Sequence, residues 1–112
     1  MSCGKGSNAL SCHKSVRCQW ERIWRAARPW IGRQAAEYGS KGIRVNAVSP
    51  EPTRTEGTDA MGEDLEQLAA QAPADRPATA DEIAEAIVFL ATDRASFIYG
   101  AKLAVDGGRT AI

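Results

Sequence analysis

The feature that most limits the fold of this chain is a short apolar stretch, residues 42–50, which starts at a glycine and leads into a Pro-Glu-Pro loop. Its apolar residues combine β-branched and small side chains over the usual length of a strand. They are Ile43, Val45, Ala47 and Val48. This composition predicts a buried strand of a parallel sheet, covered on both faces.

Charge and cysteine content divide the chain into two parts. The 112 residues carry no net charge, yet residues 1–33 hold seven Lys/Arg and one acid, whereas residues 34–112 hold seven Lys/Arg and thirteen acids. All three cysteines and all three tryptophans precede residue 34. Three cysteines cannot all pair within one chain, and no run of eighteen apolar residues is present. These counts argue against a disulfide framework and a membrane span, and we expect a reducing, cytoplasmic location.

The first part, residues 1–33, shows no sustained helical or strand period. Trp20 and Trp24 fit one helix face, which Pro29 and Gly32 then interrupt. A patternless segment rich in Arg, Trp, Cys and Ala is typical of a GC-rich coding sequence read out of frame. We therefore expect a basic, Cys/Trp-rich segment that is disordered or non-native, joined to a separate domain over residues 34–112.

Three functions remain open for residues 1–33. Cations interleaved with indoles suit nucleic acid or an anionic lipid surface, because the cations hold phosphates while the rings stack on bases or settle among headgroups. An Arg-rich, acid-poor start also fits an organelle transit peptide. Cys12, His13 and Cys18 are soft metal ligands without the paired spacing of a zinc site. The interleaved residues are Arg17, Trp20, Arg22, Trp24, Arg25, Arg28 and Trp30.

Beyond residue 34 the local signals agree with one another. Residues 35–38 are typical of the last turn of a helix, which Gly39 ends in a left-handed conformation. Asp59 is expected to cap a short helix that includes Leu65 and stops before Pro73. Both helices would flank the predicted strand in the sequence.

The most regular pattern belongs to a helix over residues 81–92. Thr79 and Glu82 form a capping box, in which each side chain bonds the other residue's backbone amide. A short strand over residues 102–105 and a tight turn over 106–108 follow. Alternation of helices and strands predicts an α/β fold with a parallel sheet. The apolar stripe of the helix comprises Ile83, Ile87 and Leu90.

Residues 50–58 follow the predicted strand directly. We expect a loop, because Pro50 and Pro52 fix φ and remove backbone donors. In open parallel sheets ligands bind at the carboxyl ends of strands, and threonine hydroxyls with free backbone amides suit a planar amide group. The loop and the short helix after it would form a mobile flap over that site. A solvated connection that binds nothing is the alternative.

Together these residues resemble the C-terminal part of a short-chain dehydrogenase/reductase, over roughly residues 34–112. The resemblance implies the C-terminal portion of a Rossmann-like, doubly wound parallel sheet that is incomplete in this chain. It also implies NAD or NADP as cofactor, hydride transfer between an alcohol and a carbonyl, and a homo-oligomer formed through residues 81–92 and 102–105. The markers are Ala36-Glu37-Tyr38-Gly39, Gly42-Ile43-Arg44-Val45-Asn46, Pro50 to Thr55, Arg76-Pro77, Phe89-Leu90-Ala91 and Val105-Asp106-Gly107-Gly108.

Four residues are assigned to cofactor binding by this resemblance: Pro50, Glu51, Thr53 and Thr55. Thr53 would offer its backbone, and Thr55 its hydroxyl, to the carboxamide of the nicotinamide. Glu51 stands where the family has glycine, and a side chain there would crowd a backbone that approaches the nicotinamide closely.

No catalytic or metal-binding residue is assigned. The family's Gly-rich phosphate turn, catalytic serine and Tyr-x-x-x-Lys pair do not occur in this sequence. Tyr38 with Lys41, and Tyr99 with Lys102, are only three residues apart, so we interpret both pairs as chance. We expect a truncated oxidoreductase, inactive alone and partly ordered. The alternative is a non-enzymatic binding protein with a basic, Trp-rich arm.

Overall fold

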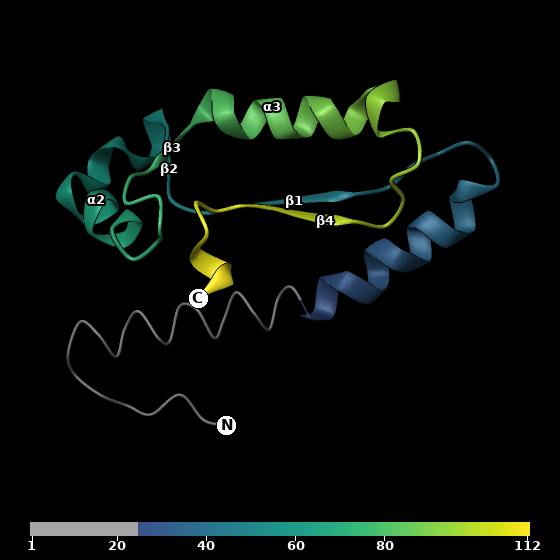
Figure 1. Cartoon of the computed structure of the whole chain (residues 1–112), viewed down its shortest axis with the longest axis horizontal. Coiled ribbons are helices and arrows are strands. Elements are labelled where there is room, and N and C mark those ends of the chain that lie inside the picture. The colour runs from purple at the N-terminus through teal and green to yellow at the C-terminus, as the bar shows by residue number, and fades with distance from the viewer. Residues whose placement is uncertain (1–24) are drawn as a thin grey trace.

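The computed structural model describes residues 25–112, beginning with a helix over residues 25–39 (Figure 1). The expectations for Cys12, His13 and Cys18, and for the tryptophans before Arg25, lie outside these residues. After the helix come β1 (Ala47–Pro50), β2 (Thr53–Arg54), η1 (a 3-10 helix, Glu56–Met61), α2 (Glu63–Ala69), β3 (Ala78–Thr79), α3 (Ala80–Ala91), η2 (Asp93–Ala95), β4 (Lys102–Val105) and η3 (Arg109–Ala111).

The helix over residues 25–39 is continuous, so the expected interruption at Pro29 and Gly32 is wrong. Its Ile31 and Ala35 are buried. A Cβ on Gly100 would lie 3.3 Å from the Ala35 Cβ and 3.8 Å from the Gly32 Cα. Packing of this face against the chain near Gly100 outweighs the poor helix propensity of proline and glycine.

The left-handed residue that stops this helix is Gly42 and not, as expected, Gly39. Gly42 has φ +77°. The Gly42 amide donates to the Gly39 carbonyl at 3.0 Å, and the Ile43 amide donates to the Tyr38 carbonyl at 3.2 Å. These two bonds form a Schellman motif, in which the left-handed residue lies three positions beyond Gly39.

The predicted α/β character is confirmed by two parallel strand pairs. β1 pairs with β4 in a register that matches Ala47 to Lys102 and Pro50 to Val105. In Figure 1, α3 runs along one side of this pair and the helix over residues 25–39 lies on the other side. The strand at residues 102–105 is found as predicted.

β1 differs from its prediction in its start and in its burial. It begins at Ala47, and Ile43 is 49% exposed, so the expected cover on both faces is absent from the described residues. The residues before β1 are held by side chains in addition to a backbone bond, in which the Gly100 amide donates to the Val45 carbonyl at 2.8 Å. The Asn46 side chain donates to the Ile98 carbonyl at 2.9 Å and accepts from the Ala101 amide at 2.8 Å.

Arg44 joins the start of β1 to the end of α3. Its guanidinium donates to the carbonyls of Leu90 at 2.7 Å, Ala95 at 2.9 Å and Thr92 at 3.0 Å. These carbonyls belong to the last turn of α3 and the residues just after it, where the regular helical bonds end. The Thr92 and Ala95 carbonyls also accept from the amides of Ala95 and Ile98. A single cationic side chain therefore satisfies the C-terminus of α3 and fixes it against the sheet.

The capping box of α3 is confirmed. The Glu82 amide donates to the Thr79 hydroxyl at 3.2 Å, and the Thr79 amide donates to the Glu82 carboxylate at 2.9 Å. The apolar stripe of this helix is only partly covered by the described residues. Leu90 is buried, whereas Ile87 is 51% and Val88 56% exposed.

Asp59 does not cap α2, contrary to expectation. It lies inside η1, and the residue that precedes α2 is Gly62, at φ +51°. A left-handed turn between η1 and α2 needs no side-chain cap and suits glycine. Leu65 and Ala69 are the buried residues of α2. Among residues 25–112 no helix is long and apolar enough to cross a membrane.

Candidate functional site

The candidate site lies where β1 and β4 end. β1 stops at Pro50, and the chain re-forms a strand at Thr53–Arg54, which pairs in parallel with β3. A 3-10 helix then begins at Glu56. The prediction of an irregular loop over residues 50–58 is therefore wrong in part. The two prolines end β1 but do not prevent pairing at Thr53.

Thr53 directs its backbone groups away from β3. Ala78 is its partner in the register, and the Ala78 amide donates to the Pro52 carbonyl at 2.9 Å. In a parallel ladder a residue bonds the two residues that flank its partner, so the amide and carbonyl of Thr53 point to the opposite side. The Thr53 hydroxyl is turned back and donates to the Glu51 carbonyl at 2.6 Å.

Thr58 contacts both residues that were assigned to the carboxamide. Its hydroxyl donates to the Thr53 carbonyl at 2.8 Å and accepts from the Thr55 amide at 2.8 Å. The Thr55 hydroxyl lies 3.4 Å from the Thr58 hydroxyl. Three threonines therefore form one small polar cluster at the end of β2.

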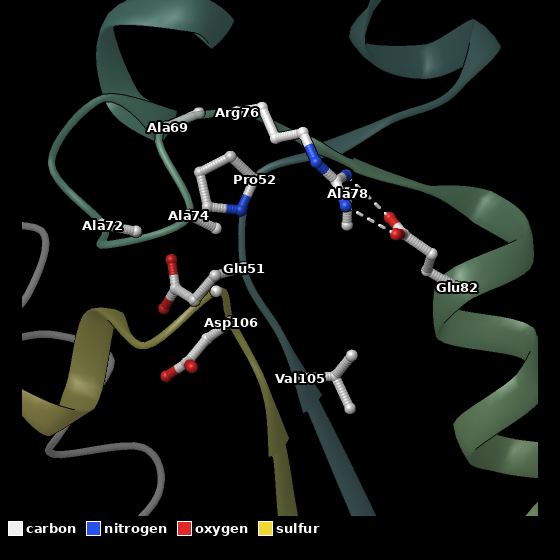
Figure 2. Close-up of a pocket in the computed structure, with 11 residues that line it drawn as sticks. Glu51, Pro52, Ala69, Ala72, Ala74, Arg76, Ala78, Glu82, Val105 and Asp106 are labelled. Atoms are coloured by element: carbon white, nitrogen blue, oxygen red, sulfur yellow. Dashed lines mark hydrogen bonds and ion pairs between the residues drawn. The ribbon is translucent and has the colours of Figure 1, made fainter.

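Glu51 faces η3 and a small cavity (Figure 2). One of its carboxylate oxygens lies 3.5 Å from an Arg109 guanidinium nitrogen, with the side chains 23% and 11% exposed. Among the described residues only Asp75 is a non-glycine with positive φ, so this backbone does not require glycine at position 51. The cavity, of about 150 Å³, is lined by Glu51, Arg76, Glu82 and Asp106 and by several alanines.

The charged side chains around the cavity have ion-pair or hydrogen-bond partners. Arg76 and Glu82 form two nitrogen–oxygen hydrogen bonds of 2.7 and 3.0 Å, drawn dashed in Figure 2. The bond from Arg76, with further bonds from Thr79, lowers the pKa of Glu82 from its ordinary 4.5 to about 2. The same pairing raises the pKa of Arg76. For Asp106, burial raises the pKa, but hydrogen bonds from Thr110 and Gly108 outweigh burial and leave it lowered.

The two Tyr–Lys pairs lie at the other end of the strands. Tyr38 and Lys41 precede β1, and Tyr99 precedes β4. The Lys41 ammonium lies 5.4 Å from the centroid of the Tyr38 ring, which is a cation–π contact. A Cβ on Gly39 would lie 3.5 Å from the Tyr99 ring, so this tyrosine packs against the end of the first helix. Neither tyrosine shares an end of the sheet with Thr53 and Thr55.

The residues present fit a nicotinamide carboxamide. That group offers one carbonyl acceptor and one NH₂ donor, and the Thr53 amide and carbonyl supply the complementary pair on one side of β2. The Thr53 carbonyl keeps one lone pair beyond its bond from Thr58. Pro50, Glu51, Thr53 and Thr55 follow one another at the carboxyl end of β1, and their roles toward a cofactor stay a prediction. In residues 25–112 no cluster of three metal-ligand side chains occurs.

Two contacts of this site were missed in the sequence. The Thr58 hydroxyl bonds and the Glu51–Arg109 pair join residues whose contact depends on the turn after β2 and on the position of η3. For Thr58 a local signal existed, because Thr55 and Thr58 have the i, i+3 spacing of a capping pair. No signal linked Glu51 to Arg109, which is 58 residues later in the chain.

Parallel strands with a polar cluster at their carboxyl ends match the place where open α/β sheets bind ligands. Residues 28–110 match the family profile described as enoyl-(acyl carrier protein) reductase. This chain belongs to the short-chain dehydrogenase/reductase family.

Relatives and solved structures agree with this assignment. The cis-4-hydroxycyclohexanecarboxylate dehydrogenase of Sinomonas cyclohexanicum is 49% identical over 79 residues, which are 70% of this chain and 32% of that protein. A solved short-chain dehydrogenase/reductase family protein is 46% identical with a TM-score of 0.70, over 79% of this chain and 36% of that one. A 4-hydroxyisoleucine dehydrogenase mutant complexed with NADH and succinate is 32% identical, with a TM-score of 0.70, over 79% and 37%. The chain thus spans about a third of the curated relatives it matches.

Proposed function

We propose that this chain is the C-terminal part of an NAD- or NADP-dependent oxidoreductase that interconverts an alcohol and a carbonyl by hydride transfer. In this proposal, residues 50–55 hold the carboxamide of the nicotinamide. The orientation of Thr53 carries the proposal, because its amide and carbonyl point away from β3 at the carboxyl end of the sheet. The relatives that match the chain are dehydrogenases and reductases.

Each residue of the site has a limited task in this proposal. A bound nicotinamide supplies the hydride donor or acceptor. The Thr53 amide and carbonyl orient its carboxamide, and the Thr55 hydroxyl adds a further polar contact. Glu51 is held by Arg109, which turns its carboxylate toward η3. Pro50 ends β1, so that the chain leaves the sheet and re-forms a strand at Thr53.

We further propose that the chain alone is incomplete and does not turn over substrate. It spans about a third of its relatives, and residues 25–112 provide no Tyr-x-x-x-Lys pair. A groove of about 390 Å³ between β1 and α3 supports incompleteness, since Ile87 at its rim is half exposed. An uncovered two-stranded sheet is marginal in water, so we expect a partly ordered chain that self-associates.

In this proposal two copies of the chain associate through α3 and β4. The protein is placed in the cytoplasm. Exposed Ile87 and Val88 on α3 support this association, because apolar side chains left in water favour burial against a second copy. Replacing Ile87→Glu should shift the chain toward monomer in sedimentation velocity, whereas Glu85→Gln on the same helix should not. An unchanged distribution for Ile87→Glu would remove α3 from the proposed contact.

The test of cofactor contact is an NMR titration of the ¹⁵N-labelled chain. Nicotinamide mononucleotide should shift the amide signals of Thr53 and Thr55, because it carries the carboxamide. Adenosine monophosphate, which lacks that group, is the matched control and should leave both signals in place. Shifts with neither ligand, or equal shifts with both, would contradict the proposed role of residues 50–55. No oxidation of NADH by the chain alone is expected.

A further inference from the structure

Thr58 makes more contacts with the candidate site than a helix cap requires. Its hydroxyl accepts from the Thr55 amide at 2.8 Å and lies 3.1 Å from the Thr55 carbonyl. These bonds are local and belong to the first turn of η1. The same hydroxyl also donates to the Thr53 carbonyl at 2.8 Å, which lies in β2 and outside η1. One side chain therefore joins the strand to the 3-10 helix.

The bonds of Thr58 fix the two peptide groups on either side of Arg54. The bonded Thr53 carbonyl belongs to the peptide before Arg54, and the bonded Thr55 amide belongs to the peptide after it. With both held by one oxygen, the backbone from Thr53 to Thr55 has little freedom to rotate. The carbonyl that would face a carboxamide is then oriented before any ligand arrives, which lowers the cost of binding.

A second contact anchors the same segment from α2. The Arg54 guanidinium forms an ion pair with Glu66. Arg54 and Thr53 are adjacent in β2, so their side chains point to opposite faces. This pair restrains the side chain of Arg54. The peptide groups on either side of Arg54 are held by Thr58 and not by this pair. The ion pair is half exposed, with side chains 55% and 52% accessible, so it contributes little by itself.

We propose that Thr58 is a positioning residue for carboxamide recognition. Its hydroxyl sets the direction of the Thr53 carbonyl and of the Thr55 amide, and it does not itself touch the ligand. This inference rests on the proposed function, because it assigns the task of Thr58 at that same site. It predicts that the hydroxyl, and not the bulk of the side chain, determines affinity for the nicotinamide end of the cofactor.

The experiment compares Thr58→Val, which keeps the shape and removes the hydroxyl, with Thr58→Ser, which keeps the hydroxyl. Thr92→Val is the matched control, because the Thr92 hydroxyl also donates to a backbone carbonyl, that of Phe89, at 2.8 Å but far from the site. Two quantities are measured by NMR on each chain. They are the affinity for nicotinamide mononucleotide and the hydrogen-exchange rate of the Thr55 amide without ligand.

Thr58→Val should speed exchange at Thr55 and weaken nicotinamide mononucleotide binding, each by roughly five- to tenfold, since a lost hydrogen bond changes an equilibrium by about that factor. Thr58→Ser should restore both values to within about twofold of the wild type, and Thr92→Val should change neither. Unchanged exchange along α3 in Thr58→Val would show that the fold is intact.

Three results would overturn the inference. If Thr58→Val speeds exchange but leaves the affinity unchanged, Thr58 is only a cap of η1. If Thr58→Ser fails to restore the affinity, the methyl group and not the hydroxyl is responsible. If the wild-type chain shows no response to nicotinamide mononucleotide, the proposed function itself fails, and the role of Thr58 in it fails too. That third result differs from the first two, in which the wild type still binds.

Discussion

The polar groups near Thr53 and the exposed apolar side chains of α3 differ in how many contacts the rest of the chain provides for them. Near Thr53, polar groups find partners within a few residues, as Thr58 does with Thr53 and Thr55. On α3, Ile87 and Val88 remain more than half exposed, although the helix itself is well capped. Hydrogen bonds of short sequence separation form within the chain alone, whereas apolar faces need a neighbouring element.

The contrast separates the part of this chain whose polar groups are satisfied locally from the part whose apolar side chains stay exposed. The polar end of the sheet, formed by Thr53, Thr55 and Thr58, is held by bonds among these residues, so its geometry should persist in this chain alone. The face of α3 with its groove toward β1 is an open surface that residues 25–112 do not cover. Substitutions should therefore act locally near Thr53 and more globally where α3 joins the sheet.

The largest effect is expected at Arg44, which joins the start of β1 to the end of α3. Arg44→Met removes three hydrogen bonds to the carbonyls of Leu90, Thr92 and Ala95. Loss of these charge-assisted bonds should lower the free energy of opening α3 by about 3 kcal/mol, measured by native-state hydrogen exchange, although the Thr92 and Ala95 carbonyls keep a backbone bond. Arg44→Lys should recover only part, because an ammonium lacks the planar fork of a guanidinium. Equal exchange in Arg44→Met and wild type would show that α3 is held by its apolar contacts alone.

The next effect is expected at Gly107, beside the polar end. Its φ is +63°, and a Cβ there would lie 2.8 Å from the Ala74 Cβ. Gly107→Ala should destabilise the turn after β4 by about 2 kcal/mol, through strain and the clash together. Gly57→Ala is the control, because its Cβ would meet only the Thr55 hydroxyl at 3.7 Å. Urea unfolding of both variants measures the difference, and similar midpoints would contradict the assigned turn geometry.

The start of α3 should respond to acid. The folded state lowers the pKa of Glu82 from 4.5 to about 2, first through Arg76 and then through Thr79. Because the pKa is lower in the folded state, the ionised Glu82 carboxylate stabilises the folded state above pH 4.5. This contribution to stability is lost as the pH falls toward 2. Amides in the first turn of α3 should therefore lose exchange protection across that window.

Glu82→Gln should remove this pH dependence, while Glu85→Gln on the same helix should preserve it. The carboxyl carbon of Glu82, followed by NMR, should titrate near the lower end of the window. A Glu82 that titrates at its ordinary value would mean that the pair with Arg76 does not persist in solution. It would also mean that the cap of α3 is held by Thr79 alone.

The smallest effect is expected for the ion pair between Arg54 and Glu66. Both side chains are about half exposed, at 55% and 52%. Glu66→Gln should lower stability by about 0.5 kcal/mol or less, and added salt should erase the difference. Urea unfolding at low and high salt measures this. A loss above about 1 kcal/mol would show that the polar end depends on α2 more than its local bonds indicate.

Much of the secondary structure followed from short-range patterns. The capping box of Thr79 and Glu82 was visible three residues apart, and the strand at residues 102–105 lay between clear turn signals. Errors arose where a distant contact decided the outcome. The first helix continues through Pro29 and Gly32 because its buried face packs near Gly100. Helix propensity alone contains no information about that contact.

The candidate site was predictable in place but not in detail. Pro50, Glu51, Thr53 and Thr55 were chosen from a resemblance, and their assignment to a cofactor remains a prediction. The pairing of β2 with β3 sets which way Thr53 faces, and a two-residue strand has too short a pattern to be recognised. The contact between Glu51 and Arg109 needed the fold to bring two distant segments together.

The sequence by itself determined the family, the α/β class and the capping box of α3, because these depend on residue order and on contacts within one turn. Only the tertiary structure decided where β1 begins and which face of α3 stays open. The physical reason is how far apart in the sequence the contacting residues are. A cap closes over three or four residues, whereas Arg44 meets its carbonyl partners 46 to 51 residues away, at a distance that no local pattern records.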